Sequence, residues 1–270
     1  MTRTILVPSS LVREAEDKRE ATRKLGYVAR AAAVFRIDRL LVFPDPGGEG
    51  RWGESFVETV LAYAATPPHL RKEVWDRRAE LEYAGILPPL RQTPQTGSGS
   101  TDSGSSRQGI VTEVGSDGRV RVNCGLQHPI SLVVPSGMEV NEGERVTVSV
   151  SSRDPVRARL VEKPPPGFRV GLSDLSTALD SEDGLAIAAS RYGDPLTAGR
   201  LQGLLGCTDD GMTVAFGAPE RGLPAVLGVE AGDPEAGFDL WLNTVPNQGS
   251  EVVRTEEAVF ATLAPLTLTE

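Results

Sequence analysis

A polar stretch in the middle of the chain sets the strongest limit on how this chain can fold. Residues 92–106 consist of Gln, Thr, Pro, Gly, Ser and Asp and hold almost no apolar side chain. Such a segment cannot bury enough apolar surface to offset the entropy lost on ordering, so we expect a mobile linker over residues 92–107. Strand and helix patterns precede it, and short alternating strands follow it. The sequence therefore predicts an α/β protein interrupted by a small β domain.

The N-terminal part has the pattern of a parallel sheet. An apolar strand over residues 4–8, a long amphipathic helix over 11–35 and a second strand over 39–43 follow one another. Two parallel neighbours need a crossover of this kind, and the crossover is right-handed. Further helices are expected over residues 53–65 and, with many charged side chains, over residues 69–83.

The segment after the linker is predicted to form a small barrel. Five short strand-like runs lie between residues 109 and 161, and Ser116-Asp117-Gly118 marks a hairpin between the first two. This density of short strands is typical of an OB-type barrel, a fold often used on single-stranded nucleic acid. Base-stacking aromatic side chains are missing from the segment. Contacts with RNA would therefore go from its arginines to phosphates.

Three buried strands near the C-terminus each end in a polar loop that contains a glycine. The strands are predicted at residues 184–189, 212–216 and 238–242. Because parallel strands end at the same edge of a sheet, we expect the three loops to meet there and bind a ligand. A last helix is expected over residues 255–265, with Thr255 as its N-cap.

The loops after the 212–216 and 238–242 strands resemble those of a known superfamily. The run from Phe216 to Leu223, followed by the run from Leu242 to Ser250 and a C-terminal helix, is similar to the SPOUT superfamily of RNA methyltransferases. The run from Phe216 resembles their Gly-Glu-Gly loop, and the run from Leu242 resembles the loop that enters their trefoil knot. Over nearly its full length the chain resembles the archaeal and eukaryotic SPOUT branch in which an OB-like domain interrupts the catalytic one.

The resemblance implies a fold, a cofactor and an assembly. The fold is α/β, a SPOUT-type parallel sheet with a C-terminal trefoil knot, interrupted by a small OB-like β-barrel. The cofactor is S-adenosylmethionine, bound through backbone amides and carbonyls, and the assembly is a homodimer. The domains are expected to be residues 1–91 and 164–270 for the SPOUT domain, 92–107 for the linker and 108–163 for the barrel.

The resemblance also assigns roles to residues of the three loops. The expected cofactor contacts are Ser190, Gly193, Phe216, Gly217, Gly222, Leu242, Asn243, Thr244, Asn247, Gln248, Gly249 and Ser250. The acceptor must lose a proton, and the two histidines, His69 and His128, are far from these loops in the sequence. Glu220, Arg254 and solvent are therefore the candidates; Arg254 is expected to orient RNA, since an arginine is a poor base. For each of these loop residues the alternative to a functional role is a structural one, in which the polar side chain only makes a local hydrogen bond.

The charge of the chain bears on RNA as a partner. A net charge of −9 argues at first sight against nucleic acid, but only four of the 28 basic residues are Lys, as in salt-adapted cytosolic proteins. Residues 107–163 carry a net +1, which leaves −10 for the rest of the chain. We expect RNA contacts from Arg71, Lys72, Arg119, Arg121, Arg157 and Arg159. For Arg71 and Lys72 the alternative is the solvated face of an amphipathic helix.

Several classes of protein are excluded or disfavoured. The chain has no long apolar run and no signal-peptide pattern, so we expect a cytoplasmic protein without a membrane span. Two distant cysteines, Cys124 and Cys207, and two histidines do not suit a disulfide framework or a metal centre. No Gly-x-Ser-x-Gly elbow or phosphate-binding P-loop is present, which disfavours hydrolases and kinases.

Two functions remain. The resemblance implies an S-adenosylmethionine-dependent RNA methyltransferase acting on ribosomal RNA, with uridine N3 indicated by a eukaryotic relative. The alternative is a non-catalytic RNA-binding or ribosome-assembly factor that keeps the same fold. Gly217, Gly222 and Gly249 favour the enzyme, because a decayed pocket would not need a close approach of backbone to ligand.

Overall fold

The computed structural model describes residues 2–48, 50–90, 105–180, 184–208 and 210–268. Of the predicted linker, residues 92–104 lie outside this described part, and residues 105–107 belong to a strand. The chain forms two compact units. The first consists of Met1–Ala65, Arg78–Leu90 and Phe168–Glu270, and the second of Thr66–Arg77 and Arg91–Gly167.

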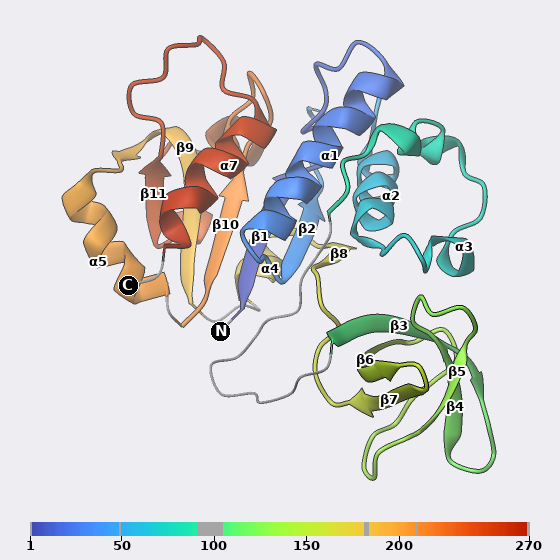
Figure 1. Ribbon diagram of the computed structural model, residues 1–270. Helices are drawn as coiled ribbons and strands as arrows, with labels where there is room; N and C mark the ends of the chain where they lie inside the picture. Colours follow the sequence, from blue (N-terminus) through green and yellow to red (C-terminus); the bar gives the residue numbers. More distant parts are fainter. Residues whose placement is uncertain (1, 49, 91–104, 181–183, 209, 269–270) are drawn as a thin grey trace. The chain divides into compact units, whose positions relative to one another are not determined.

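The first unit is built on a six-stranded sheet in the order β11-β9-β10-β1-β2-β8 (Figure 1). Every neighbouring pair is parallel, which confirms the predicted parallel sheet. The strands are β1 (Arg3–Pro8), β2 (Arg39–Phe43), β8 (Arg169–Leu172), β9 (Leu185–Pro195), β10 (Met212–Phe216) and β11 (Leu240–Asn243). The N-terminal strand β1 lies between β2 and β10, so both halves of the chain build one sheet.

Helices cover both faces of this sheet. They are α1 (Lys18–Val34), α2 (Glu54–Ala65), α4 (Leu175–Asp180), α5 (Ala198–Thr208), α6 (Leu223–Leu227) and α7 (Thr255–Leu266), with 3₁₀ turns at Ala79–Leu81, Ala84–Ile86 and Pro234–Ala236. Figure 1 shows α1 and α7 side by side across one face. The first helix starts later than predicted, because Asp17 Oδ1 accepts a hydrogen bond from Glu20 N–H (2.7 Å) and caps it there.

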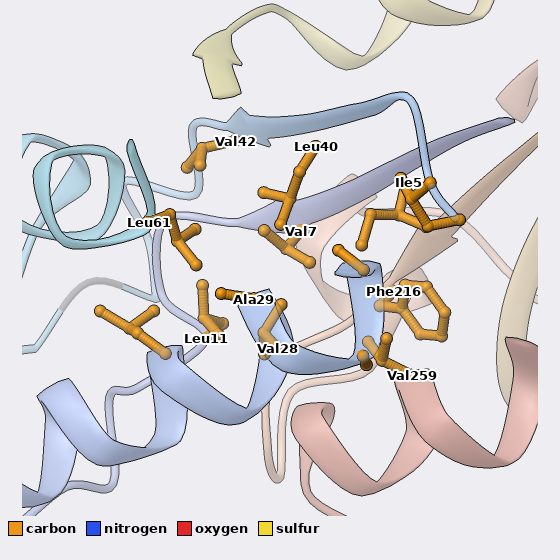
Figure 2. Close-up of a cluster of buried hydrophobic side chains, with 14 of the residues drawn as sticks. Ile5, Val7, Leu11, Val28, Ala29, Leu40, Val42, Leu61, Phe216 and Val259 are labelled. Carbon is orange, nitrogen blue, oxygen red and sulfur yellow. The ribbon is translucent and has the colours of Figure 1, made fainter. Parts of the chain in front are cut away.

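Two hydrophobic cores form because side chains alternate along each strand. Ile5, Val7 and Phe216 are buried on one face, where they belong to the cluster that includes α1, α2 and α7 (Figure 2). Leu6 and Ala215 point to the other face, into a cluster with α4 and α6. The sheet is therefore the middle of three layers, and its C-terminal edge is left to the loops.

The second unit is a nearly closed antiparallel barrel in the order β5-β4-β3-β6-β7, with β5 and β7 adjacent. Its strands are β3 (Ser105–Val114), β4 (Arg119–Asn123), β5 (Ile130–Val133), β6 (Arg145–Arg153) and β7 (Val156–Val161). Val122 and Val148 are fully buried in its core. The predicted hairpin is confirmed, with Gly118 at φ 74° in its turn. The predicted small barrel is thus present.

The predicted charged helix over residues 69–83 is wrong. Within it only Arg71–Val74 is α-helical (α3), Ala79–Leu81 forms a 3₁₀ turn, and the segment 66–77 belongs to the barrel unit. The reason is its hydrogen bonds to the barrel, since His69 Nε2 lies 3.0 Å from the carbonyl oxygen of Gln108 and Asn123 Nδ2 donates to Glu73 Oε1 (3.3 Å). These contacts outweigh the helical pattern of the segment.

Charged side chains are buried where α1 meets α7. Lys24 Nζ lies 2.6 Å from Glu14 Oε1 and 3.3 Å from Glu20 Oε1. Glu256, in the first turn of α7, is only 7 % exposed, and its Oε2 has no hydrogen-bond partner. Burial raises the pKa of the Glu256 carboxyl above its ordinary range.

We predict that Glu256→Gln stabilises the protein at neutral pH. A raised pKa in the folded state means that ionised Glu256 disfavours folding, so wild-type stability falls as the pH rises through this pKa. The advantage of the variant should be largest at neutral pH and shrink as the pH falls toward the ordinary glutamate range, about 4.3. Urea unfolding at a series of pH values measures it, with the exposed Glu230→Gln as control. A gain of equal size at every pH would contradict the prediction.

Candidate functional site

A cavity lies at the C-terminal edge of the sheet, among residues 189–192 of β9 and the segments that follow β10 and β11. Its volume is about 270 Å³, near the lower end of small-molecule sites. The walls come from the end of β9, the loop after β10, the segment between β11 and α7, and α7 itself. In Figure 1 the segment between β11 and α7 rises beyond the arrowheads of the strands. The three segments therefore meet where parallel sheets bind ligands.

The cavity brings together part of the predicted site. The predicted residues that line it are Ser190, Phe216, Gly217, Glu220, Gly222, Asn243, Thr244 and Gln248. Outside its lining are Gly193, Leu242, Asn247, Gly249, Ser250 and Arg254. Lining residues that were not among the predicted contacts, although Arg191, Tyr192 and Val245 lie in the predicted loops, include Arg191, Tyr192, Val245, Thr255 and Thr262.

The strand β9 makes an excursion that forms one wall of the cavity. Its pairing with β11 passes from Ala188↔Trp241 directly to Asp194↔Leu242, so residues 189–193 bulge out; we call them the β9 excursion. The excursion returns at Gly193, where a Cβ would lie 2.6 Å from Leu242 N. Gly193 is therefore required by the close approach of two backbones.

The loop after β10 forms a tight turn with a strained residue. Ala218 N–H donates to Arg221 O (2.9 Å) and Arg221 N–H donates to Ala218 O (3.1 Å), with Pro219 and Glu220 between them. Glu220 has φ 60°, a left-handed conformation that this type of turn usually gives to Gly or Asn. A strain of this kind costs about 1–3 kcal/mol and is typical of residues whose side chain is used. Glu220 lies at the cavity, exposed to solvent.

A buried ion pair that the sequence analysis missed fixes the same loop. Asp45, at the end of β2, is 2 % exposed and accepts hydrogen bonds from Ser10 Oγ (2.6 Å), Arg221 Nε (3.1 Å) and Arg221 Nη2 (3.2 Å). Its own N–H donates to Ser9 Oγ (2.9 Å). The pair therefore joins the loops after β1, β2 and β10. The sequence signal that could have indicated this interaction is the position of Ser9, Ser10 and Asp45 just after two predicted strands.

The segment after β11 uses its polar side chains to hold its own shape. Asn243 Nδ2 donates to Arg191 O (2.9 Å), and Asn243 Oδ1 accepts from Val245 N–H (3.0 Å). Gln248 Nε2 donates to Ser250 O (2.9 Å), and Thr244 Oγ1 lies 2.8 Å from Thr262 Oγ1 of α7. Local hydrogen bonds thus account for these side chains.

The start of α7 differs by one residue from the prediction. Arg254 is the N-cap, and its backbone N–H donates to Glu257 Oε2 (2.9 Å). Thr255, predicted as the cap, instead donates through Oγ1 to Gly217 O (2.8 Å) and links α7 to the β10 loop. The Arg254 side chain is exposed and outside the cavity.

All six residues predicted to contact RNA lie in the barrel unit. Some already have partners in the protein: Arg119 Nε donates to Ser131 Oγ (2.9 Å), and Arg121 Nη1 lies 3.6 Å from Glu113 Oε2. Arg157 and Arg159 alternate with Ala158 on β7, so they share one face of that strand. Their contact with RNA stays a prediction.

Two other kinds of feature are absent from the part of the chain that the structure describes. Within those residues, no helix combines the length and the apolar character needed to cross a membrane. Nor do the described residues bring together three or more His, Cys, Asp or Glu side chains that could hold a metal ion.

The comparison with known proteins decides the family. The family model described as "Putative RNA methyltransferase" matches residues 2–266. The chain belongs to this family. An uncharacterized protein of Haloarcula marismortui is 68 % identical over 281 residues, which cover all of both chains. The 28S rRNA (uridine-N(3))-methyltransferase of Homo sapiens is 30 % identical over 310 residues, which cover 98 % of this chain and 77 % of the human one.

Membership of an RNA methyltransferase family implies S-adenosylmethionine, and the cavity lining suits such a molecule. The half-buried Val245 offers apolar surface at the cavity, whereas the Phe216 side chain is buried in the core. Gly222 is exposed, and a Cβ built there meets only Pro224 Cδ, at 3.6 Å, so its backbone is open to a ligand.

We predict that adding a methyl group at the two glycines of the β10 loop changes the free energy of unfolding by clearly different amounts. In Gly217→Ala the new Cβ would lie 2.7 Å from Gly222 Cα and Leu223 N, so the backbone must shift, at a cost of about 1–3 kcal/mol. Gly222 has φ −64° and ψ 168° and free space, and the lower unfolded-state entropy of alanine opposes its weaker preference for the N-cap of α6, so Gly222→Ala should change stability by less than about 1 kcal/mol. Urea unfolding of both variants measures the difference. Equal destabilisation of the two would contradict the geometry.

Proposed function

We propose that the protein is an S-adenosylmethionine-dependent RNA methyltransferase that methylates uridine N3 in ribosomal RNA. The observation that carries the proposal is the meeting of the β9 excursion with the segments after β10 and β11 around one cavity at the C-terminal edge of the sheet. The similarity to the human 28S rRNA (uridine-N(3))-methyltransferase over nearly the whole chain supports the choice of substrate.

Catalysis of this reaction depends mainly on how the protein positions the two reactants. The cofactor, when bound, supplies a methyl group on a positively charged sulfur. The protein has to hold uracil N3 in line with that methyl, so that a carbon–nitrogen bond forms while the carbon–sulfur bond breaks and its electron pair stays on sulfur. The proton of N3 must leave to a base or to solvent.

Different residues at and beside the cavity are assigned to cofactor binding, proton acceptance and RNA binding. Since the side chains of Asn243, Thr244 and Gln248 are engaged within the protein, we assign cofactor contacts mainly to backbone groups of their segment and of Gly217 and Gly222. Glu220 is proposed as the acceptor of the N3 proton, because it is the carboxylate of the strained turn at the cavity. Arg254 is proposed to hold an RNA phosphate from its exposed position beside the cavity.

Two substitutions separate these roles. Glu220→Gln should lower the methylation rate by about 10²-fold, the usual contribution of a general base, with cofactor affinity unchanged. Arg254→Gln should weaken RNA binding and leave cofactor affinity unchanged. Single-turnover methylation and RNA titration measure the two effects, and full activity of Glu220→Gln would remove Glu220 from the mechanism.

We add two structural proposals that go with this family. The segment between β11 and α7 is proposed to form the trefoil knot, supported by its return to the β10 loop through Thr255 and Gly217. The functional assembly is proposed to be a homodimer, which sedimentation equilibrium would test by a mass of two chains. A crystal structure that traces the segment without a knot would contradict the first.

Isothermal titration with S-adenosylmethionine and S-adenosylhomocysteine, in molar salt to suit the acidic chain, tests the cofactor. We expect micromolar binding at one site per chain, lost in Gly222→Val because the side chain would extend into the cavity without disturbing the fold. Gly199→Val is the matched control, since a Cβ at Gly199 on α5 meets no atom within 4 Å. A folded protein without binding would favour the non-catalytic RNA-binding factor.

A further inference from the structure

An aromatic side chain stands exposed at the cavity. Tyr192 lines the cavity and is 61 % exposed, more than any other large hydrophobic side chain in the described residues. Aromatic residues make up only 5 % of the chain. A large exposed ring next to a ligand cavity has surface available for a binding partner.

Arg191 holds this ring. Its guanidinium carbon lies 4.7 Å from the centroid of the Tyr192 ring, and Arg191 Nη2 donates a hydrogen bond to the Tyr192 hydroxyl oxygen. Arg191 is also exposed and lines the cavity. A planar cation on an aromatic ring forms a flat, positively charged surface.

The pair sits on a fixed support. Both residues belong to the β9 excursion, whose two ends pair with β11. Asn243 Nδ2 holds Arg191 O, Tyr192 N–H donates to Ser190 Oγ (3.2 Å), and Gly193 lies against the backbone of Leu242. The ring is therefore placed before any ligand arrives, which lowers the entropy lost on binding.

The chemistry of the pair suits an unpaired nucleobase. Sequence-selective RNA sites stack splayed-out bases on aromatic rings and guanidinium planes. The N3 of a uracil in a duplex is occupied by base pairing, so its methylation requires a base that has left the helix. The barrel segment, residues 108–163, has no Phe, Tyr or Trp and cannot supply a ring of this kind.

We propose that Tyr192 and Arg191 form a stacking platform that receives the unpaired target base of the RNA at the mouth of the cavity. The substrate class is therefore a uridine in a single strand or loop, and paired uridines are excluded. The inference rests on the proposed function for the identity of the reaction, and it names the residues that present the base.

The test compares Tyr192→Phe with Tyr192→Ala in the full chain at one fixed salt concentration. The probes are fluorescein-labelled oligouridine, alone and paired with oligoadenosine. We expect wild type to prefer the single strand, Tyr192→Phe to retain this affinity, and Tyr192→Ala to lose about tenfold to a hundredfold, the usual effect of removing one stacked base contact. Tyr27→Ala, which removes another exposed tyrosine on α1, is the matched control.

Titration of each variant with S-adenosylmethionine separates this inference from the proposed function. Unchanged cofactor affinity with lost oligouridine affinity in Tyr192→Ala supports the platform. Tyr192→Ala that binds oligouridine as wild type does, or a duplex bound as well as the single strand, overturns the platform and leaves the cofactor site intact. Tyr192-dependent RNA binding without any cofactor binding would overturn the proposed function and keep the platform.

Discussion

Parallel pairing of β1 with β10 is the interaction on which the first unit depends. The register runs from Arg3↔Met212 to Leu6↔Ala215, and β2 pairs with the opposite edge of β1. Neither half of the chain can complete the sheet alone, although the barrel unit lies between the halves in sequence. The Asp45–Arg221 ion pair adds a further link between the halves at the edge that carries the cavity. Because Asp45 is buried, removal of Arg221 would leave this carboxylate without its charged partner.

The cavity shows a division between backbone and side chains. The polar side chains of Asn243, Thr244 and Gln248 form hydrogen bonds within the protein, and these bonds fix the path of the segment along the cavity. Glycine at 217 permits two backbones to come together, whereas glycine at 222 keeps a surface bare. Glycine is therefore present at these two positions of one loop for two different physical reasons.

Much of the fold could be predicted because its signals are local. Short apolar runs bounded by Gly and Pro indicated β1, β2, β10 and the barrel strands, and the shared edge of parallel strands predicted that three loops would meet. The β9 excursion could not be predicted from local sequence. Asp194 and Pro195 belong to the strand because they pair with β11, and that pairing is a tertiary contact. The helix over residues 69–83 failed for the same reason, because contacts with the barrel replaced it. No local pattern links Asp45 to Arg221, 176 positions later.

The position of β1 in the sheet has a consequence for how the protein is made. On a ribosome the chain emerges from its N-terminal side, so the edge of β1 that will face Met212 stays unpaired while the roughly 200 residues between β1 and β10 are translated. Bare edges of apolar strands invite pairing with other chains. Every wall of the cavity comes from residue 189 onward, so a nascent chain that stalls before that point carries the aggregation hazard without any part of the pocket.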